Sequence, residues 1–200
     1  MKSIQKIFRL QLLLLCQIFT ALCLCSCANE YQPYEILHLP KYQPTYTCYT
    51  LWYTDPMNMT SENIQQGTII PFGTEVMLFK MTDSEIRFYL NEKEFCIKLA
   101  DSALESIQSF VKRTFSDKTA DQLLQNSSAA EFEKIRRGVV SEGMTESQVL
   151  VALGKPSLSR SPNLKDNTWI YQAGPVKSKR IIFQNNGKGK ERTVQRIFEL

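Results

Sequence analysis

The sequence predicts a mixed α+β fold: a small β-rich region, then two helices on a three-stranded antiparallel sheet. Short runs of β-branched and aromatic residues recur through residues 46–100, as in a small barrel or sandwich. Two helix-start signals follow within residues 128–156. Three more strand-like runs lie within residues 168–200. Helices grouped before antiparallel strands are typical of an α+β unit with its helices on one face.

The N-terminal segment has the three parts of a secretory signal peptide over residues 1–26. Lys2, Lys6 and Arg9 precede an apolar run over residues 10–24. Small Ser26 then precedes Cys27, and this pattern resembles the lipobox of bacterial lipoproteins. The resemblance implies that Cys27 is lipidated and becomes the mature N-terminus, and Ala28 favours the outer membrane. The alternatives are an ordinary cleaved signal peptide and an uncleaved helix, although the run is shorter than the ~20 residues of a membrane span.

The composition after the leader gives no strong charge. Three of the 24 Lys and Arg residues lie in residues 1–26 and none of the 20 Asp and Glu residues do, so the remainder carries +1. Such a balance does not predict a nucleic-acid partner. The single histidine, His38, and the lack of a CxxC pair predict no metal site. No nucleophile, phosphate-loop or dinucleotide motif is present, so we expect neither a cofactor nor an enzyme.

Residues 27–45 are polar, contain three prolines and show little periodicity, which predicts a tether. Fully extended, residues 28–45 would span about 60 Å. We therefore expect the folded part to stand away from the membrane, with His38 facing solvent or an edge.

The β-rich region, residues 46–100, divides into five expected strands. They cover residues 46–54, 68–70, 75–80, 86–90 and 94–99, with a hairpin turn at 91–93. The piece GTIIPFGTEVML loosely resembles a segment of bacterial SH3-like modules. That resemblance would make Tyr49, Trp52 and Tyr53 an exposed binding set, whereas such aromatic residues are also common in a core.

Cys48 and Cys96 are the only cysteines after Cys27. An oxidising periplasm favours a disulfide between them. The alternative is two buried free thiols, because both residues lie in strand-like runs.

A helical connector is expected over residues 101–127. Leu104, Ile107 and Val111 form an apolar stripe in a predicted helix over 103–115, capped by Asp101 or Ser102. A short helix over 118–124 follows. We expect a domain boundary or hinge near its end.

The C-terminal region, residues 128–200, has the most consistent local signals. Ser128 with Glu131, and Thr145 with Gln148, fit two capping boxes. Gly143 ends the first helix, and Gly154 with Pro156 ends the second. Strands are expected at 168–172, 179–184 and 193–200, with a turn at Asn186-Gly187.

The run EGMTESQVLVALGKPS and the strands after it resemble the SmpA/OmlA family, whose members carry the BamE-like domain, over about residues 131–197. The matching motif comprises Gly143, Met144, Thr145, Val149, Leu153, Gly154, Pro156, Trp169 and Tyr171. The resemblance implies an outer-membrane lipoprotein that binds protein partners of the cell envelope, including those of the barrel-assembly machinery, and anionic lipid. Each motif residue is also explained by helix caps, turns or core packing alone.

Basic residues gather near the C-terminus. Lys179, Arg180, Lys188, Lys190 and Arg192 are candidates for a patch that binds anionic lipid or an acidic partner. A solvated hairpin with solubilising charges is the alternative.

The leading hypothesis is an outer-membrane lipoprotein on the periplasmic face that acts as an accessory factor in outer-membrane protein assembly or envelope integrity. A second hypothesis is an envelope module that binds peptidoglycan or a peptide through its β-rich region. A third, by fold analogy only, is a secreted-type enzyme inhibitor.

Overall fold

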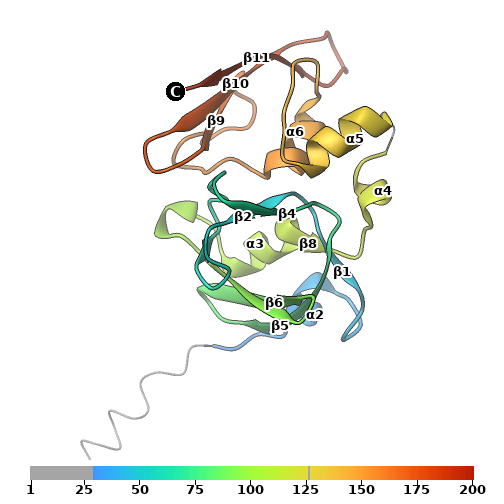
Figure 1. Ribbon diagram of the computed structural model, residues 1–200, viewed down its shortest axis with the longest axis vertical. Helices are drawn as coiled ribbons and strands as arrows, with labels where there is room; N and C mark the ends of the chain where they lie inside the picture. Colours follow the sequence, from blue (N-terminus) through green and yellow to red (C-terminus); the bar gives the residue numbers. More distant parts are fainter. Residues whose placement is uncertain (1–28, 126) are drawn as a thin grey trace, which may run out of the picture.

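The computed structural model describes residues 29–125 and 127–200, and it is a mixed α+β structure with a curled multi-stranded sheet and few helices (Figure 1). The predicted α+β class is therefore confirmed. The predicted signal peptide and Cys27 lie outside the described residues. No helix in the described part of the chain is long and apolar enough to span a bilayer.

The N-terminal part is built mostly of short strands. Its elements are α2 (Pro33–Leu37), β1 (Thr45–Thr47), β2 (Leu51–Tyr53), β3 (Met59–Thr60), β4 (Thr68–Ile70), β5 (Glu75–Met81), β6 (Glu85–Leu90), β7 (Lys93–Lys98), a 3₁₀ turn (Asp101–Ala103), α3 (Ile107–Thr114) and β8 (Phe115–Ser116). Six strands form one sheet in the order β3-β7-β6-β5-β1-β8, and β2 pairs with β4 separately. All neighbours are antiparallel except β3 and β7.

The first half of β5 and most of β6 alternate buried and less buried residues, and a register shift between Leu78 and Lys80 interrupts this alternation in β5. Val76, Leu78 and Met81 point into the core, where they meet Phe88 and Phe110. The predicted turn between β6 and β7 is confirmed: Asn91 and Glu92 both have positive φ, as a two-residue hairpin turn requires.

The predicted tether is wrong for residues 31–45, which fold against the β-rich part. Tyr31 pairs with Met81 at the end of β5, and the side chain of Tyr34 in α2 is buried in the core. His38 ends α2 in the left-handed conformation. Apolar Ile36, Leu37 and Leu39 supply the surface that packs on this core, which outweighs the flexibility suggested by the prolines.

The helix predicted over 103–115 is shorter than expected, because α3 begins after Ser106. The Ser106 hydroxyl accepts a hydrogen bond from Ser109 N at 3.2 Å, so Ser106 rather than Asp101 or Ser102 is the N-cap. Leu104 lies before it with φ of 52°, which prevents a continuous helix from residue 103.

The C-terminal part consists of short helices followed by three strands. After α4 (Ala120–Leu123) come α5 (Ala129–Arg136), α6 (Glu146–Leu153), β9 (Thr168–Gln172), β10 (Ser178–Gln184) and β11 (Thr193–Glu199). The three strands are antiparallel in the order β11-β10-β9. Both predicted capping boxes are present, at Ser128 with Glu131 and at Thr145 with Gln148.

The connector contributes side chains to both cores. Ile107, Phe110 and Val111 of α3 belong to the N-terminal core, whereas Leu124, after α4, belongs to the C-terminal core. Phe72, which follows β4, also lies in the C-terminal core and meets Phe132 of α5 edge-on, with ring centroids 5.2 Å apart. The two parts therefore share apolar packing.

The N-terminal part also caps the C-terminal ends of α5 and α6. The last carbonyls of a helix have no partner within it and need an outside donor. Thr50 N donates to Val151 O at 3.1 Å, and Thr50 Oγ1 donates to Ile135 O at 3.3 Å. Asn63 Nδ2 donates to Leu153 O at 2.9 Å. Both helices thus depend on residues that lie 85 to 101 positions earlier in the chain.

Candidate functional site

The C-terminal sheet has one covered face and one open face. Trp169, Tyr171, Ile181 and Phe183 point to the covered face and pack with α5 and α6. Side chains at the alternate positions point the other way. We call these the outer face; it comprises Thr168, Ile170, Gln172, Ser178, Arg180, Ile182, Gln184, Arg196 and Phe198.

The register places apolar and basic residues of this outer face side by side. Arg180 lies between Ile170 on β9 and Phe198 on β11, and Ile182 pairs with Arg196. Phe198 is 42% exposed, and both arginines are exposed. Within the described residues neither guanidinium takes part in an ion pair, so both are free to bind a partner.

The bulge in β11 changes which residues share this face. The register between β10 and β11 shifts after Ile182, so Phe183 pairs with Val194 and an extra residue, Gln195, is accommodated. Arg196 and Phe198 consequently lie on the outer face while Val194 stays buried. Sequence alternation alone did not single out Phe198 as a surface residue.

The predicted basic patch is not one surface. Lys179 lies on the covered side of β10 next to Glu199, with Nζ 3.6 Å from the carboxylate, whereas Arg180 lies on the outer face. Lys188 and Lys190 are exposed in the β10–β11 loop. Only Arg180 of the five predicted residues contributes to the outer face.

Arg192 is a structural residue instead of a patch residue. Its side chain is 12% exposed and forms an ion pair with Glu146 in the first turn of α6. The guanidinium also donates to the carbonyls of Leu164, Lys165 and Asp166. Arg192 thereby holds the loop before β9 against α6, and its guanidinium is not free to bind an anionic ligand.

The nine residues that resemble the SmpA/OmlA motif are all used in building the fold. Met144, Val149, Leu153, Trp169 and Tyr171 are buried, Thr145 caps α6, and Pro156 is buried after it. Gly143, with φ of 87°, donates its N–H to Val194 O at 2.8 Å. The Tyr171 hydroxyl donates to Gly154 O at 3.0 Å, and burial raises the pKa of that phenol.

Of the two alternatives for Cys48 and Cys96, the structure has the free thiols and no disulfide between them. The Cys48 thiol donates to Ser116 Oγ at 3.4 Å, and the Cys96 thiol donates to Glu85 Oε2 at 3.5 Å. Burial raises the pKa of both thiols, that of Cys96 to about 11. Neither has the lowered pKa of a nucleophilic cysteine.

The expected aromatic binding set is not exposed as a group. Tyr49 is 4% exposed, while Trp52 and Tyr53 are half-buried. Lys93 lies over the rings of Tyr53 and Phe95. These three residues therefore give little support to the hypothesis that the β-rich region binds peptidoglycan or a peptide.

Other aromatic residues line an open groove of about 640 Å³ beside the start of β5 and the end of β6. Tyr34, Tyr42, Pro44, Met77 and Tyr89 supply its apolar lining, and Glu75 and Glu92 are its charged residues. We call it the aromatic groove. The sequence signal for it is β5 itself, EVMLFKM, which is apolar at consecutive positions and so has an apolar residue on both faces.

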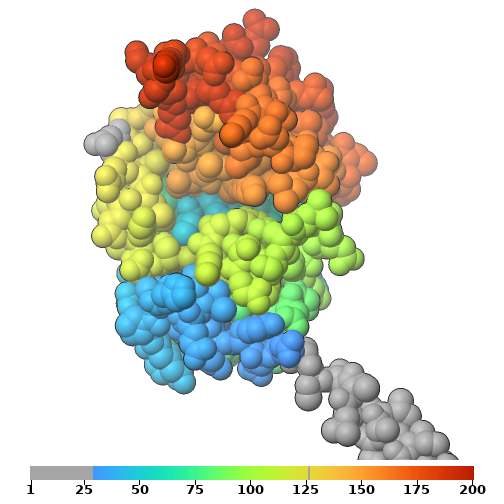
Figure 2. Space-filling view, turned by 180° about the vertical axis from the view of Figure 1, so that it is seen from behind, coloured from blue at the N-terminus to red at the C-terminus, as the bar shows by residue number. Residues whose placement is uncertain are grey.

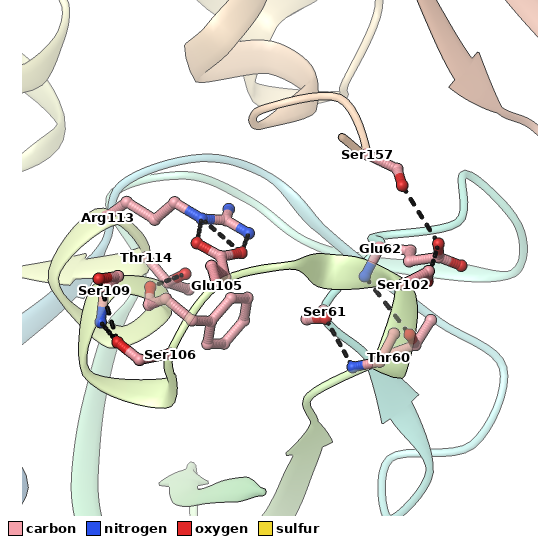
Figure 3. A network of polar contacts seen from close by, with 12 residues as sticks. Thr60, Ser61, Glu62, Ser102, Glu105, Ser106, Ser109, Arg113, Thr114 and Ser157 are labelled. Atoms are coloured by element: carbon pink, nitrogen blue, oxygen red, sulfur yellow. Dashed lines mark hydrogen bonds and ion pairs between the residues drawn. The ribbon is translucent and has the colours of Figure 1, made fainter. Parts of the chain in front are cut away.

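A polar network lies where α3 meets the loops around it (Figure 3). Glu62 accepts hydrogen bonds from Ser102 Oγ at 2.7 Å and from Ser157 Oγ at 3.2 Å, and thus links three segments. Nearby, Arg113 forms a two-pronged ion pair with Glu105. These carboxylates are bound by structural donors, so the network stabilises the junction and presents no free acid or base.

The Arg113 side of this network is largely buried. Arg113 also donates to the Tyr49 hydroxyl at 3.1 Å and lies over the ring of Phe110. Burial opposes the charge of Arg113, but Tyr49 and Glu105 raise its pKa, so it stays protonated. Burial raises the pKa of Tyr49, which stays neutral.

No group of three or more His, Cys, Asp or Glu residues in the described part of the chain is arranged to hold a metal ion. Comparison with protein families, with curated proteins and with solved structures finds no match for this chain.

Proposed function

We propose that this chain is a lipid-anchored protein of the bacterial outer membrane that binds protein partners of the cell envelope through the outer face of its C-terminal sheet. The observation that carries the proposal is the grouping of Phe198, Ile170 and Ile182 with the unpaired Arg180 and Arg196. Aromatic and arginine residues are enriched at protein interfaces, and they supply much of the binding energy there.

The order of the C-terminal elements supports the same proposal. Two short helices followed by three antiparallel strands agree with the ααβββ unit of the SmpA/OmlA family, to which residues 131–197 are similar. The role that follows is that of an accessory factor in outer-membrane protein assembly or envelope integrity, anchored through Cys27.

Crosslinking in living cells tests this proposal. A photoreactive amino acid at Phe198 is expected to trap an envelope protein, whereas the same group at exposed Leu104, far along the chain, serves as the control. Arg180→Glu with Arg196→Glu should reduce the yield from position 198. If position 198 traps nothing more than position 104 does, the outer face is not the binding surface. If it traps partners unrelated to barrel assembly, the accessory role is wrong.

A further inference from the structure

The fold begins only a few residues after the expected lipidation site. Tyr31 N donates to Met81 O at 2.8 Å, and the Tyr31 hydroxyl donates to Asp83 at 2.6 Å. Asn29 Nδ2 donates to the same carboxylate at 3.2 Å. The four residue steps from Cys27 to Tyr31 can span at most about 14 Å. A lipid on Cys27 would therefore hold this end of the molecule directly against the bilayer.

An apolar surface lies beside this attachment point. Phe79 is two residues from Met81, about 7 Å along β5. It stacks on Tyr89 of β6, with ring centroids 4.5 Å apart, and Met77 pairs with Tyr89 in the register. Met77 is 46% exposed, Phe79 36% and Tyr42, across the aromatic groove, 68%.

We propose that this surface, formed by Tyr42, Met77, Phe79 and Tyr89, rests on the lipid–water interface of the membrane that holds the Cys27 lipid. Tyrosine suits that position, because its ring is apolar and its hydroxyl stays hydrated at the headgroups. A second weak apolar contact also complements an acyl anchor. This inference rests on the lipid anchor of the proposed function and adds an orientation to it.

The charges of the surface indicate a zwitterionic bilayer as its occupant. The charged residues that line the aromatic groove are Glu75 and Glu92, and no Lys or Arg lines it. Lys41 lies over the ring of Tyr42, with Nζ 5.0 Å from the ring centroid, so charges of both signs border the surface. These charges favour neither an anionic nor a cationic headgroup, and the contact is mainly apolar.

The orientation places the proposed binding surface at the far end of the molecule. Figure 2 shows the first described residues at one end of the molecule and the C-terminal strands at the other, as Figure 1 does from the opposite side. With β5 and β6 on the membrane, β9, β10 and β11 lie at the end of the molecule away from the bilayer, where a partner in the periplasm can reach them.

Quenching by brominated lipid tests the orientation. The full acylated protein is reconstituted into phosphatidylcholine vesicles with and without bromine on the acyl chains. The Phe79→Trp variant is compared with a matched control, Phe198→Trp, and the parent emission of Trp52 and Trp169 is subtracted. We expect bromine to remove most of the added emission of Phe79→Trp and little of that of Phe198→Trp. Met77→Trp replaces the first variant if that one does not fold.

Each outcome has a definite meaning. Bright emission from both β5 variants in acylated protein, or equal quenching at both ends, overturns the orientation and leaves the outer face free to bind partners. If the emission of the β5 variants responds to a soluble peptide but not to bromine, the aromatic groove is a ligand site. That result also overturns the proposed orientation. An intact mass without acyl groups at Cys27 overturns the anchor itself, and with it this inference.

Discussion

The ring of Tyr49 lies against Gly154, and this contact joins the two parts of the molecule. A Cβ on Gly154 would lie 2.6 Å from two ring carbons of Tyr49. Gly154 ends α6 with φ of 77° and ψ of −176°, a conformation that is almost restricted to glycine. The Tyr49 hydroxyl is in turn fixed by Thr114 at 3.0 Å. Gly154 is therefore required both for its backbone and for its missing side chain.

Gly154→Ala should lower the free energy of unfolding by about 2–4 kcal/mol, because backbone strain and the clash with Tyr49 add together. At this chain length that corresponds to a loss of roughly 4–16 °C in Tm. Gly187→Ala is the matched control: Gly187 has φ of 99° but no neighbour within 4 Å. Thermal unfolding of both variants gives the contribution of the contact. Equal losses of stability in the two variants would mean that the Tyr49 ring moves aside without an energetic penalty.

Asn63→Ala should destabilise the protein by about 2–4 kcal/mol, because it leaves buried carbonyls without donors. The Asn63 amide donates to Leu153 O and to Thr50 O, both at 2.9 Å, and accepts from Trp52 N. Hydrogen exchange at the end of α6 should accelerate more than exchange within β6. Asn58→Ala, at an exposed asparagine, is expected to change little. A uniform change in exchange would argue against a local capping role.

The sequence was sufficient for several contacts between residues that are close in the chain, although the local cap of α3 at Ser106 was missed. Ser128 with Glu131 and Thr145 with Gln148 form the predicted capping boxes, because these hydrogen bonds span three residues. The turn at Asn91 was predictable for the same reason. The three C-terminal strands were predicted from the runs TWIYQ, KRIIFQ and TVQRIFEL, with Asn186-Gly187 between the last two.

Contacts between distant segments could not be predicted in this way. Neither Thr50 nor Asn63 lies in a local sequence pattern that indicates a hydrogen bond to a helix about 90 residues later. The segment around Tyr34 looked like a tether, because its few apolar residues gain a partner only in the folded protein. The run of consecutive apolar residues in β5, which includes Met77 and Phe79, is consistent with an exposed apolar face. A strand that is buried on both faces has the same sequence pattern, so the sequence could not distinguish the two.

Arg192→Ser should destabilise the fold by about 3 kcal/mol, because it leaves the partly buried Glu146 and three loop carbonyls without their partner. Lys188→Ser with Lys190→Ser should leave stability within about 0.5 kcal/mol of the parent, since both side chains are exposed. Chemical denaturation compares them. If Arg192→Ser unfolds at the parent's midpoint, the loop before β9 does not need this guanidinium.

Two thiols should be available in the denatured protein without any reductant. In the acylated chain Cys27 is blocked as a thioether, so alkylation followed by mass measurement should add two groups, at Cys48 and Cys96. The folded protein should react slowly at pH 8, because burial raises the pKa of both thiols. Denatured protein that takes up no label until reductant is added would establish a disulfide instead.

Alkaline pH should destabilise the protein through Cys96. Its thiol has a pKa of about 11 in the fold and 9.0 as the ordinary value, because burial and the adjacent Glu85 disfavour the thiolate. Between these values the unfolded chain has lost the proton that the folded chain retains, so the free energy of unfolding falls as pH rises from 9 towards 11. Cys96→Ala should reduce this slope, whereas Cys48→Ala, at a half-buried site, should reduce it less. Urea denaturation at pH 8, 9.5 and 10.5 measures the slopes, and an unchanged slope in Cys96→Ala would assign the alkaline loss to other groups.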